Sequence, residues 1–182
     1  MNKYFLILFL ILFSNKTTAQ IKENIIQKFE EINNISFNFE QNINGKIENG
    51  NCIVQYPKKI YCVYNLNNQK ILVSDGKSLV IKTKTSYYLY PLDKTPLNLI
   101  LDKNYLMRKI NDLEERIVNN NLINYTIQEK DSRINIFFDN KTFNLIGWQN
   151  TDMYQNFNIT FLSSIRKNRL LAKNLFKLPS QN

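Results

Sequence analysis

Short β-type segments separated by turn residues make up most of this chain, and this pattern constrains the fold more than any other feature. Asp75-Gly76 separates two of the segments, and Asp-Gly between apolar strands is a strong hairpin signal, because a type I′ turn uses two residues with positive φ. Asn140-Lys141 and Asp152-Met153 are further predicted turns. The strand-like segments are 36–41, 46–56, 59–65, 69–74, 77–83, 86–90, 122–130, 133–139, 143–151 and 154–164. Their spacing predicts an antiparallel meander of roughly nine to eleven strands.

Three segments outside the strands favour helix. Ile21, Ile25, Phe29 and Ile32 follow helical spacing with charged residues between them, which predicts a helix over 20–34 that stops at Asn33-Asn34. The charged segment 105–118 is compatible with a second helix, and 169–176 with a final helical turn before Pro179.

The predicted sheet is interrupted once, at 91–104. Leu97, Leu99, Ile100 and Leu101 make this stretch strongly apolar and predict a short helix, with Thr95 as its N-cap and Pro96 as its first residue. An apolar helix inserted between strands has to cover something. Together with the N-terminal helix it could close the mouth of a curved sheet.

Several strands carry apolar residues on both faces, notably 60–64, 71–73 and 79–81. Strands of this kind are covered on both sides. One interpretation is an ordinary core against the helices. The other is a curved sheet whose concave face holds an apolar ligand under a helical lid.

The N-terminus has the pattern of a secretory signal peptide. A short positive start precedes ten apolar residues, 4–13, which span only about 15 Å as a helix, half of a hydrocarbon core. Thr17 and Ala19 then suit a cleavage site before Gln20; the alternative is an uncleaved anchor or an internal helix. We therefore expect a signal peptide at 1–19 and one domain at 20–182. Without a cysteine at the cleavage site, the exported product is expected to be free of a lipid anchor and periplasmic.

Composition argues against most enzyme classes. The chain has no histidine and two cysteines, which excludes histidine-based catalysis and histidine or thiolate metal cages, so we expect no catalytic residue, metal or cofactor. The net charge is +9, but the basic residues are scattered rather than gathered on one element with stacking aromatics. Nucleic acid is therefore not an expected partner.

Residues 50–104 carry a family resemblance. A strand that opens with Gly50 leads to Pro57, the hairpin Ile71-Leu72-Val73-Ser74-Asp75-Gly76-Lys77 follows, and then comes Thr95-Pro96-Leu97. Phe37 to Gln41 and Phe176 to Pro179 add weaker matches. This combination resembles the outer-membrane lipoprotein carrier (LolA) family.

The resemblance implies a fold and a function. The family fold is an incomplete antiparallel β-barrel, a half-barrel, with a helical lid over an apolar cavity. Its members are soluble periplasmic shuttles, which predicts a monomeric, non-enzymatic chaperone that shields the acyl chains of triacylated lipoproteins. The implied partners are an inner-membrane ATP-driven extractor and an outer-membrane acceptor, or the membrane itself.

Strand parity and the resemblance together select candidate site residues. Cys52, Val54 and Tyr56 share one strand face, and Ile60, Cys62 and Tyr64 share one face of the next strand. The predicted acyl-chain cavity comprises Phe37, Phe39, Val54, Tyr56, Ile60, Cys62, Tyr64, Leu79 and Ile81. The predicted lid comprises Ile25, Phe29, Leu97, Ile100 and Leu101.

One position departs from the family. The family's lid-contacting arginine aligns with Tyr56. Either the Tyr56 hydroxyl, Lys58 or Lys59 takes over its role, or the lid closes by apolar packing alone.

The two cysteines predict a disulfide. If the loop is 56–58, Val54 faces Ile60 and Cys52 faces Cys62, and opposed Cβ atoms in a hairpin reach disulfide range. A two-residue loop would break this register. An exported protein meets the oxidising conditions that such a bond needs.

Three function classes remain open. The first is the lipoprotein carrier, and the second is another periplasmic lipid-binding or ligand-binding half-barrel, acceptor-like or a sensor domain. The third is an exported hydrolase, against which Asp112, Glu114 and Glu115 fit a solvated helix face rather than a catalytic pair.

Overall fold

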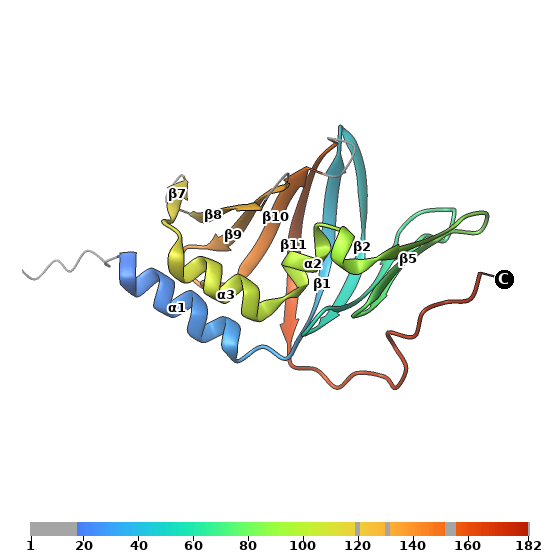
Figure 1. The fold of residues 1–182 in the computed structure, drawn as a ribbon, viewed down its shortest axis with the longest axis horizontal. Coiled ribbons are helices and arrows are strands. Elements are labelled where there is room, and N and C mark those ends of the chain that lie inside the picture. Colours follow the sequence, from blue (N-terminus) through green and yellow to red (C-terminus); the bar gives the residue numbers. More distant parts are fainter. Residues whose placement is uncertain (1–17, 119–120, 130–131, 152–155, 182) are drawn as a thin grey trace, which may run out of the picture.

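The computed structural model describes residues 18–118, 121–129, 132–151 and 156–181 (Figure 1). Its helical elements are α1 (Thr18–Glu30), η1 (Leu92–Lys94), α2 (Leu97–Leu101) and α3 (Lys103–Asp112). Its strands are β1 (Asn34–Ile43), β2 (Lys46–Gln55), β3 (Lys59–Tyr64), β4 (Ile71–Asp75), β5 (Ser78–Lys82), β6 (Tyr87–Pro91), β7 (Arg116–Val118), β8 (Leu122–Glu129), β9 (Ser132–Asp139), β10 (Leu145–Thr151) and β11 (Phe157–Lys167). The predicted signal peptide lies mostly outside the described residues, as does the predicted turn at Asp152-Met153.

All eleven strands join one antiparallel sheet that is not closed into a barrel. The order is β6-β5-β4-β3-β2-β1-β11-β10-β9-β8-β7, so β6 and β7 are its two edges. β1 to β6 form one meander and β7 to β11 another, and the pairing of β1 with β11 joins the two halves. The predicted fold, a mainly antiparallel half-barrel with helices, is confirmed.

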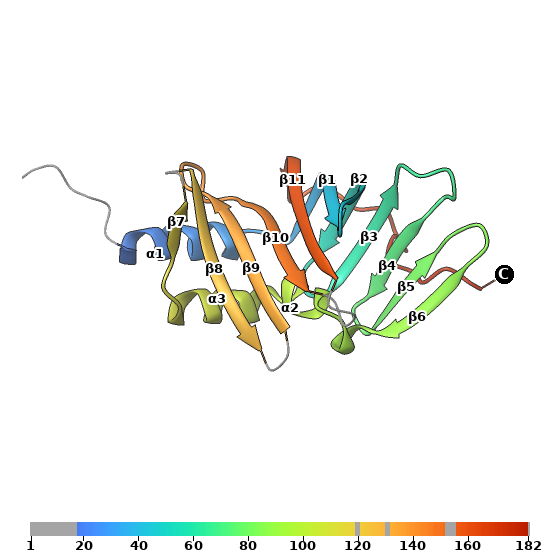
Figure 2. The same cartoon turned by 90° about the horizontal axis from the view of Figure 1, so that it is seen from above.

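The helices lie along one face of the sheet. Figures 1 and 2 show α1 and α3 side by side over the half that contains β8 and β9, while α2 lies over the half that contains β1 and β2. Ile25 and Phe29 of α1, and Leu106 and Ile110 of α3, are at most 2% exposed. Their i, i+4 spacing turns one apolar stripe of each helix onto the sheet.

Alternation along the central strands sorts their side chains between two faces. Ile35, Phe37 and Phe39 of β1 point to the helix-covered face and are at most 5% exposed. Gly50 of β2 lies so close to β3 that a Cβ there would collide with the Val63 carbonyl oxygen. A larger residue at this position would push the two strands apart.

Two predicted helices end earlier than expected. α1 stops at Glu30 rather than at 34, because the Asn168 side chain accepts the backbone N–H of Asn33 at 2.8 Å and draws this segment into β1. α3 stops at Asp112 rather than at 118. The β-branched residues Ile117 and Val118 pair with β8 instead and form the edge strand β7.

Two local predictions were wrong in detail. Thr95 does not cap α2: its hydroxyl donates to the Leu92 carbonyl at 2.8 Å, and the N-cap position is held by Pro96. The β4–β5 hairpin is present, but Asp75 belongs to β4. Of the two central residues of this turn, Gly76 and Lys77, only Gly76 has a positive φ, +103°. One positive φ at the first central position matches a type II′ turn rather than type I′.

The outer face of β4 and β5 is also covered. Val73 and Val80 are opposed across these strands on the face away from the helices, and both are at most 1% exposed. The C-terminal segment 169–181 lies on this face, where Lys82 Nζ donates to the Ser180 carbonyl at 2.7 Å (Figure 1). The segment predicted as a helical turn, 169–176, forms only a hydrogen-bonded turn at 173–176, and the rest of this C-terminal strap has no helix.

Candidate functional site: a cavity between the sheet and the α2 segment

A cavity of about 240 Å³ lies between the inner face of the sheet and the residues that lead into α2. Thr95, Pro96 and Leu97 line its helical side. The sheet side comes from both halves of the molecule, since β1 to β5 contribute together with β10 and β11. The cavity therefore sits across the β1–β11 junction.

Seven of the residues predicted for the cavity line it in the structure. They are Phe37, Phe39, Ile60, Cys62, Tyr64, Leu79 and Ile81. Each occupies an inward position of its strand. Period-two alternation grouped these residues by face, and the family resemblance at Tyr56 indicated which face is the inner one. Cys52, Leu72, Ile43 and Trp148 complete the apolar lining.

The other two predicted cavity residues lie elsewhere. Val54 is 3% exposed and belongs to the filled core, and the Tyr56 ring packs against Phe29 of α1 at a centroid distance of 5.7 Å. Both are on the predicted face, but they are nearer the 56–58 loop, where helices fill the space. Burial raises the pKa of the Tyr56 hydroxyl.

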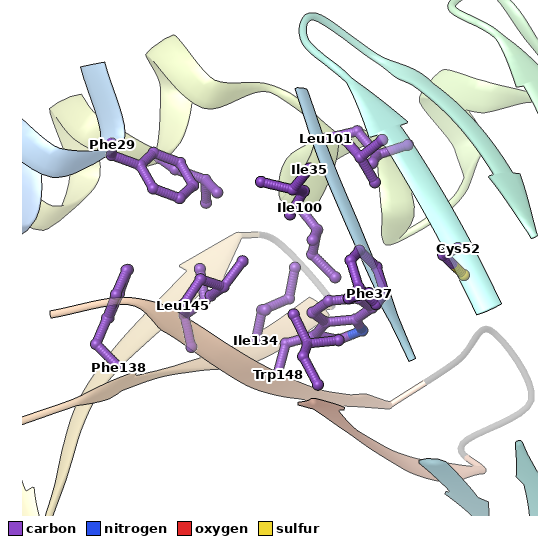
Figure 3. Packing of buried hydrophobic residues seen from close by; sticks show 14 of the residues in the cluster. Phe29, Ile35, Phe37, Cys52, Ile100, Leu101, Ile134, Phe138, Leu145 and Trp148 are labelled. Carbon is purple, nitrogen blue, oxygen red and sulfur yellow. The ribbon is translucent and has the colours of Figure 1, made fainter. Parts of the chain in front are cut away.

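The predicted lid residues divide in the same way. Leu97 lines the cavity, whereas Ile100 and Leu101 are at most 4% exposed and point into the core (Figure 3). Ile25 and Phe29 of α1 also lie in that core, and Phe29 meets Phe138 edge to face at 6.2 Å. The part of the cover that touches the cavity is therefore 95–97.

Five polar residues on the sheet side of the lining were not predicted. They are Gln41, Lys70, Asn150, Asn158 and Thr160. The side chain of Gln41 donates to Asn158 Oδ1 at 2.9 Å, although 117 residues separate the two. Only the long-range pairing of β1 with β11 brings these groups together. The signal available in the sequence was strand parity, since Gln41 has the same parity as Phe37 and Phe39.

A buried ion pair lies next to these polar residues of the cavity lining. Glu48 is 3% exposed and accepts from Lys70 Nζ and, at 2.9 Å, from Lys46 Nζ. Burial by itself would raise the pKa of the Glu48 carboxyl, but the two lysines outweigh it and hold that pKa below its ordinary value. Lys70 Nζ also lies 4.1 Å from the centroid of the Tyr64 ring, a cation–π contact.

A disulfide joins Cys52 and Cys62 across the β2–β3 hairpin. The two residues are directly opposed in the register, with Val54 opposite Ile60, as a three-residue loop at 56–58 requires. Both cysteines line the cavity, so the bond forms part of its wall.

The junction of α2 and α3 is tied to the 56–58 loop through Lys58. Its backbone N–H donates to the Leu101 carbonyl at 3.0 Å, and its Nζ lies 3.4 Å from Asp102 Oδ2. Asp102 also caps α3 by accepting from the Tyr105 N–H at 3.0 Å. Of the three substitutes considered for the family arginine, Lys58 is the one with polar contacts to the lid segment.

The site offers apolar surface and hydrogen-bonding groups rather than a reactive constellation. Among the described residues no three His, Cys, Asp or Glu side chains come together as metal ligands. Asp112, the last residue of α3, and Glu114 are exposed as predicted. The prediction of a solvated helix face was wrong for Glu115, which lies after the helix end and whose Oε1 is buried without a hydrogen-bond partner among the described residues. None of the three lines the cavity.

The sequence matches the family model described as outer membrane lipoprotein carrier protein LolA over residues 30–179. The chain belongs to the LolA family. No curated protein sequence matches it. In the part of the chain that the structure describes, no helix has the length and apolarity needed to cross a membrane.

Solved structures share the fold at low identity. An uncharacterized conserved protein from Thermus thermophilus is 7% identical with a TM-score of 0.52, over 91% of this chain and 96% of that chain. A LolA superfamily protein from Nitrosomonas europaea is 8% identical with a TM-score of 0.48, over 89% of this chain and 98% of that chain. Likeness at this level of identity concerns the fold alone.

Proposed function

We propose that this LolA-family protein is a periplasmic chaperone that shields the acyl chains of lipoproteins and carries them from the inner to the outer membrane. The observation that carries the proposal is the cavity, whose wall is built from Phe37, Phe39, Leu72, Leu79 and other apolar side chains under a helical cover. Membership of the lipoprotein carrier family supports the same conclusion.

The physical need for such a carrier is large. Transfer of an acyl chain from an apolar environment to water costs about 0.8 kcal/mol per CH₂, so a triacylated protein cannot cross an aqueous space unshielded. An apolar wall covers chains without reading the sequence of the attached protein. Non-specific covering of this kind suits a carrier with many cargoes.

The volume of the cavity implies that its cover moves. At about 240 Å³ it is below the roughly 300–1,000 Å³ of common small-ligand sites, and three acyl chains need more room than that. We infer that the segment around Leu97 swings away during loading. Lys58 contacts the α2–α3 junction, so it would hold the C-terminal end of the moving segment in place while the segment opens.

Loading and release require partners. The proposal includes an inner-membrane ATP-driven extractor that supplies lipoproteins, and an outer-membrane acceptor, or the membrane itself, that receives them. The carrier acts as a monomer, and the segment 1–19 directs its export before removal.

The small cavity also favours a second candidate, a lipid-binding half-barrel that holds a single acyl chain. Mass spectrometry of the gently purified periplasmic protein distinguishes the two, because a carrier co-purifies with triacylated lipoprotein and a single-chain binder with free lipid. A carrier also releases lipoproteins from spheroplasts. Apo protein that releases none would overturn the carrier function.

A further inference from the structure

The cavity has two ends of different chemistry. Ile60 and Leu79 are in register with Ile35 of β1 and form the apolar end. Gln41 lies six residues further along β1, and Asn158 and Thr160 gather beside it at the other end. Gln41 is opposite Glu48 on one side and opposite Thr160 on the other. The polar groups therefore come from neighbouring positions on β1, β2 and β11 and form one local patch in the cavity wall.

Thr160 is the unusual member of this patch. Thr160 belongs to the cavity lining, is directly opposite Gln41 and is 4% exposed, yet its buried Oγ1 has no hydrogen-bond partner among the described residues. A buried hydroxyl without a partner is unfavourable, and such groups in folded proteins call for an explanation. A ligand that accepts a hydrogen bond at this point supplies one.

The charges around the patch select the kind of acceptor. Lys70 is the cation of the lining, and its Nζ is already paired with the buried carboxylate of Glu48, which Lys46 also contacts. The charge of Lys70 is thus neutralised by Glu48 and does not require an anionic ligand. Glu48 of β2 is opposite Gln41, so a neutral acceptor fits this environment better than a free carboxylate, which would add a second negative charge near it.

We propose that the polar end binds the ester or amide carbonyl of an acylated ligand, with the Thr160 hydroxyl donating to the carbonyl oxygen. The acyl chain then extends along Phe39 and Tyr64 toward the apolar end. This inference rests on the proposed acyl-chain function and narrows the ligand class to molecules whose chain is joined through a neutral carbonyl.

Two lipids that differ only in the carbonyl test the proposal. The binding of 1-monododecanoylglycerol, an ester, and 1-O-dodecylglycerol, its ether analogue, is measured by calorimetry with the whole exported chain, below the micelle concentration of either lipid. We expect the ester to bind about five- to tenfold more tightly, which corresponds to one net hydrogen bond. Dodecanoate is expected to bind less tightly than the ester.

Variants assign the preference to the hydroxyl. Thr160→Val removes the hydroxyl and should make the two affinities equal, whereas Thr160→Ser keeps a donor and should retain the preference. Thr85→Val, an exposed position in the β5–β6 turn, is the matched control and should behave as the unaltered protein. The serine variant keeps the test decisive if valine disturbs folding.

The outcomes distinguish the proposed carbonyl site from the proposed acyl-chain function. Equal affinity of the unaltered protein for ester and ether, or a preference that persists in Thr160→Val, overturns the carbonyl site and leaves acyl binding intact. Tighter binding of dodecanoate than of the ester overturns the choice of a neutral carbonyl. Failure to bind either lipid overturns the acyl-chain function itself.

Discussion

Lys58 Nζ lies 3.4 Å from Asp102 Oδ2, and this ion pair ties the loop between β2 and β3 to the residue that caps α3. The Lys58 backbone N–H reinforces the tie through the Leu101 carbonyl. Both side chains are about one-third exposed, so the pair can break without burying an unpaired charge. It therefore has the properties of a reversible tether for the lid segment.

Removal of the Lys58 charge should loosen the lid with little loss of stability. For Lys58→Met we expect faster amide hydrogen exchange over residues 97–112, and a free energy of unfolding lower by no more than about 1 kcal/mol. The backbone bond to Leu101 remains, so the exchange increases without the lid unfolding. Lys59→Met, on the same hairpin, is the control; equal exchange in both variants would argue against the tether.

The Cys52–Cys62 disulfide should stabilise the domain. It closes a loop with a sequence separation of 10, for which chain entropy predicts about 2–3 kcal/mol. Cys52→Ala/Cys62→Ala should lose that amount in urea unfolding. A reducing agent should destabilise the unaltered protein by a similar amount and leave the double variant unchanged. Identical midpoints with and without reductant would contradict the prediction.

Filling the cavity should block lipid binding. Ile81 is half-buried and lines the cavity, so Ile81→Trp places an indole where an acyl chain would lie. We expect at least a tenfold loss of affinity for 1-monododecanoylglycerol, with an unchanged far-UV circular dichroism spectrum. Leu89→Trp, at a 57% exposed position on β6, is the control and should bind normally. Unimpaired binding by Ile81→Trp would place the ligand elsewhere.

Glu48 should make stability depend on pH in the acid range. Its pKa in the folded protein lies below the ordinary 4.5, so the folded state binds its proton less readily than the unfolded chain does. The ion pair therefore stabilises the protein above about pH 4.5, and this contribution is lost as the pH falls through the lowered value. Glu48→Gln should lower the free energy of unfolding at pH 7 by about 2 kcal/mol.

The comparison that isolates this effect is the difference in stability between the unaltered protein and Glu48→Gln. It should shrink steadily between pH 5 and pH 3 in denaturant titrations. Glu40→Gln, an exposed position on β1, should show no such change. If the difference in the free energy of unfolding between the unaltered protein and Glu48→Gln stayed constant from pH 5 to pH 3, the Glu48 carboxylate would not be the source of the pH dependence.

The C-terminal strap should stabilise the outer face of β2 to β5. Phe176 is half-buried and shares a cleft with Gln55 and Lys59, which are on this face. We expect Phe176→Ala to lower the free energy of unfolding by about 1–2 kcal/mol, from the apolar area it covers. Leu170→Ala, in the same strap but fully exposed, should have no measurable effect. Equal losses in both variants would show that the strap acts through something other than the burial of Phe176.

Much of one wall of the cavity could be predicted from local patterns. The three-residue loop at 56–58 sets the register of β2 and β3, and that register brings Cys52 opposite Cys62. The lid residues were harder to assign. Ile100 and Leu101 have the apolar character of a lid but fill the core, because an apolar helix looks the same in sequence whether it covers a cavity or packs against a sheet.

Local sequence patterns were sufficient to predict ten of the eleven described strands and the hairpins between neighbours, because side-chain alternation and turn length act over a few residues. The pairing of β1 with β11 depends on the packing of the whole fold, and it brings Gln41 beside Thr160 and Asn158 at one end of the cavity. The same packing also placed the C-terminal strap against β5 and β6, where Lys82 and Tyr87 donate to the Ser180 and Pro179 carbonyls. These contacts join residues about a hundred positions apart, and their partners are chosen by how the whole sheet and its helices pack, which no local pattern records.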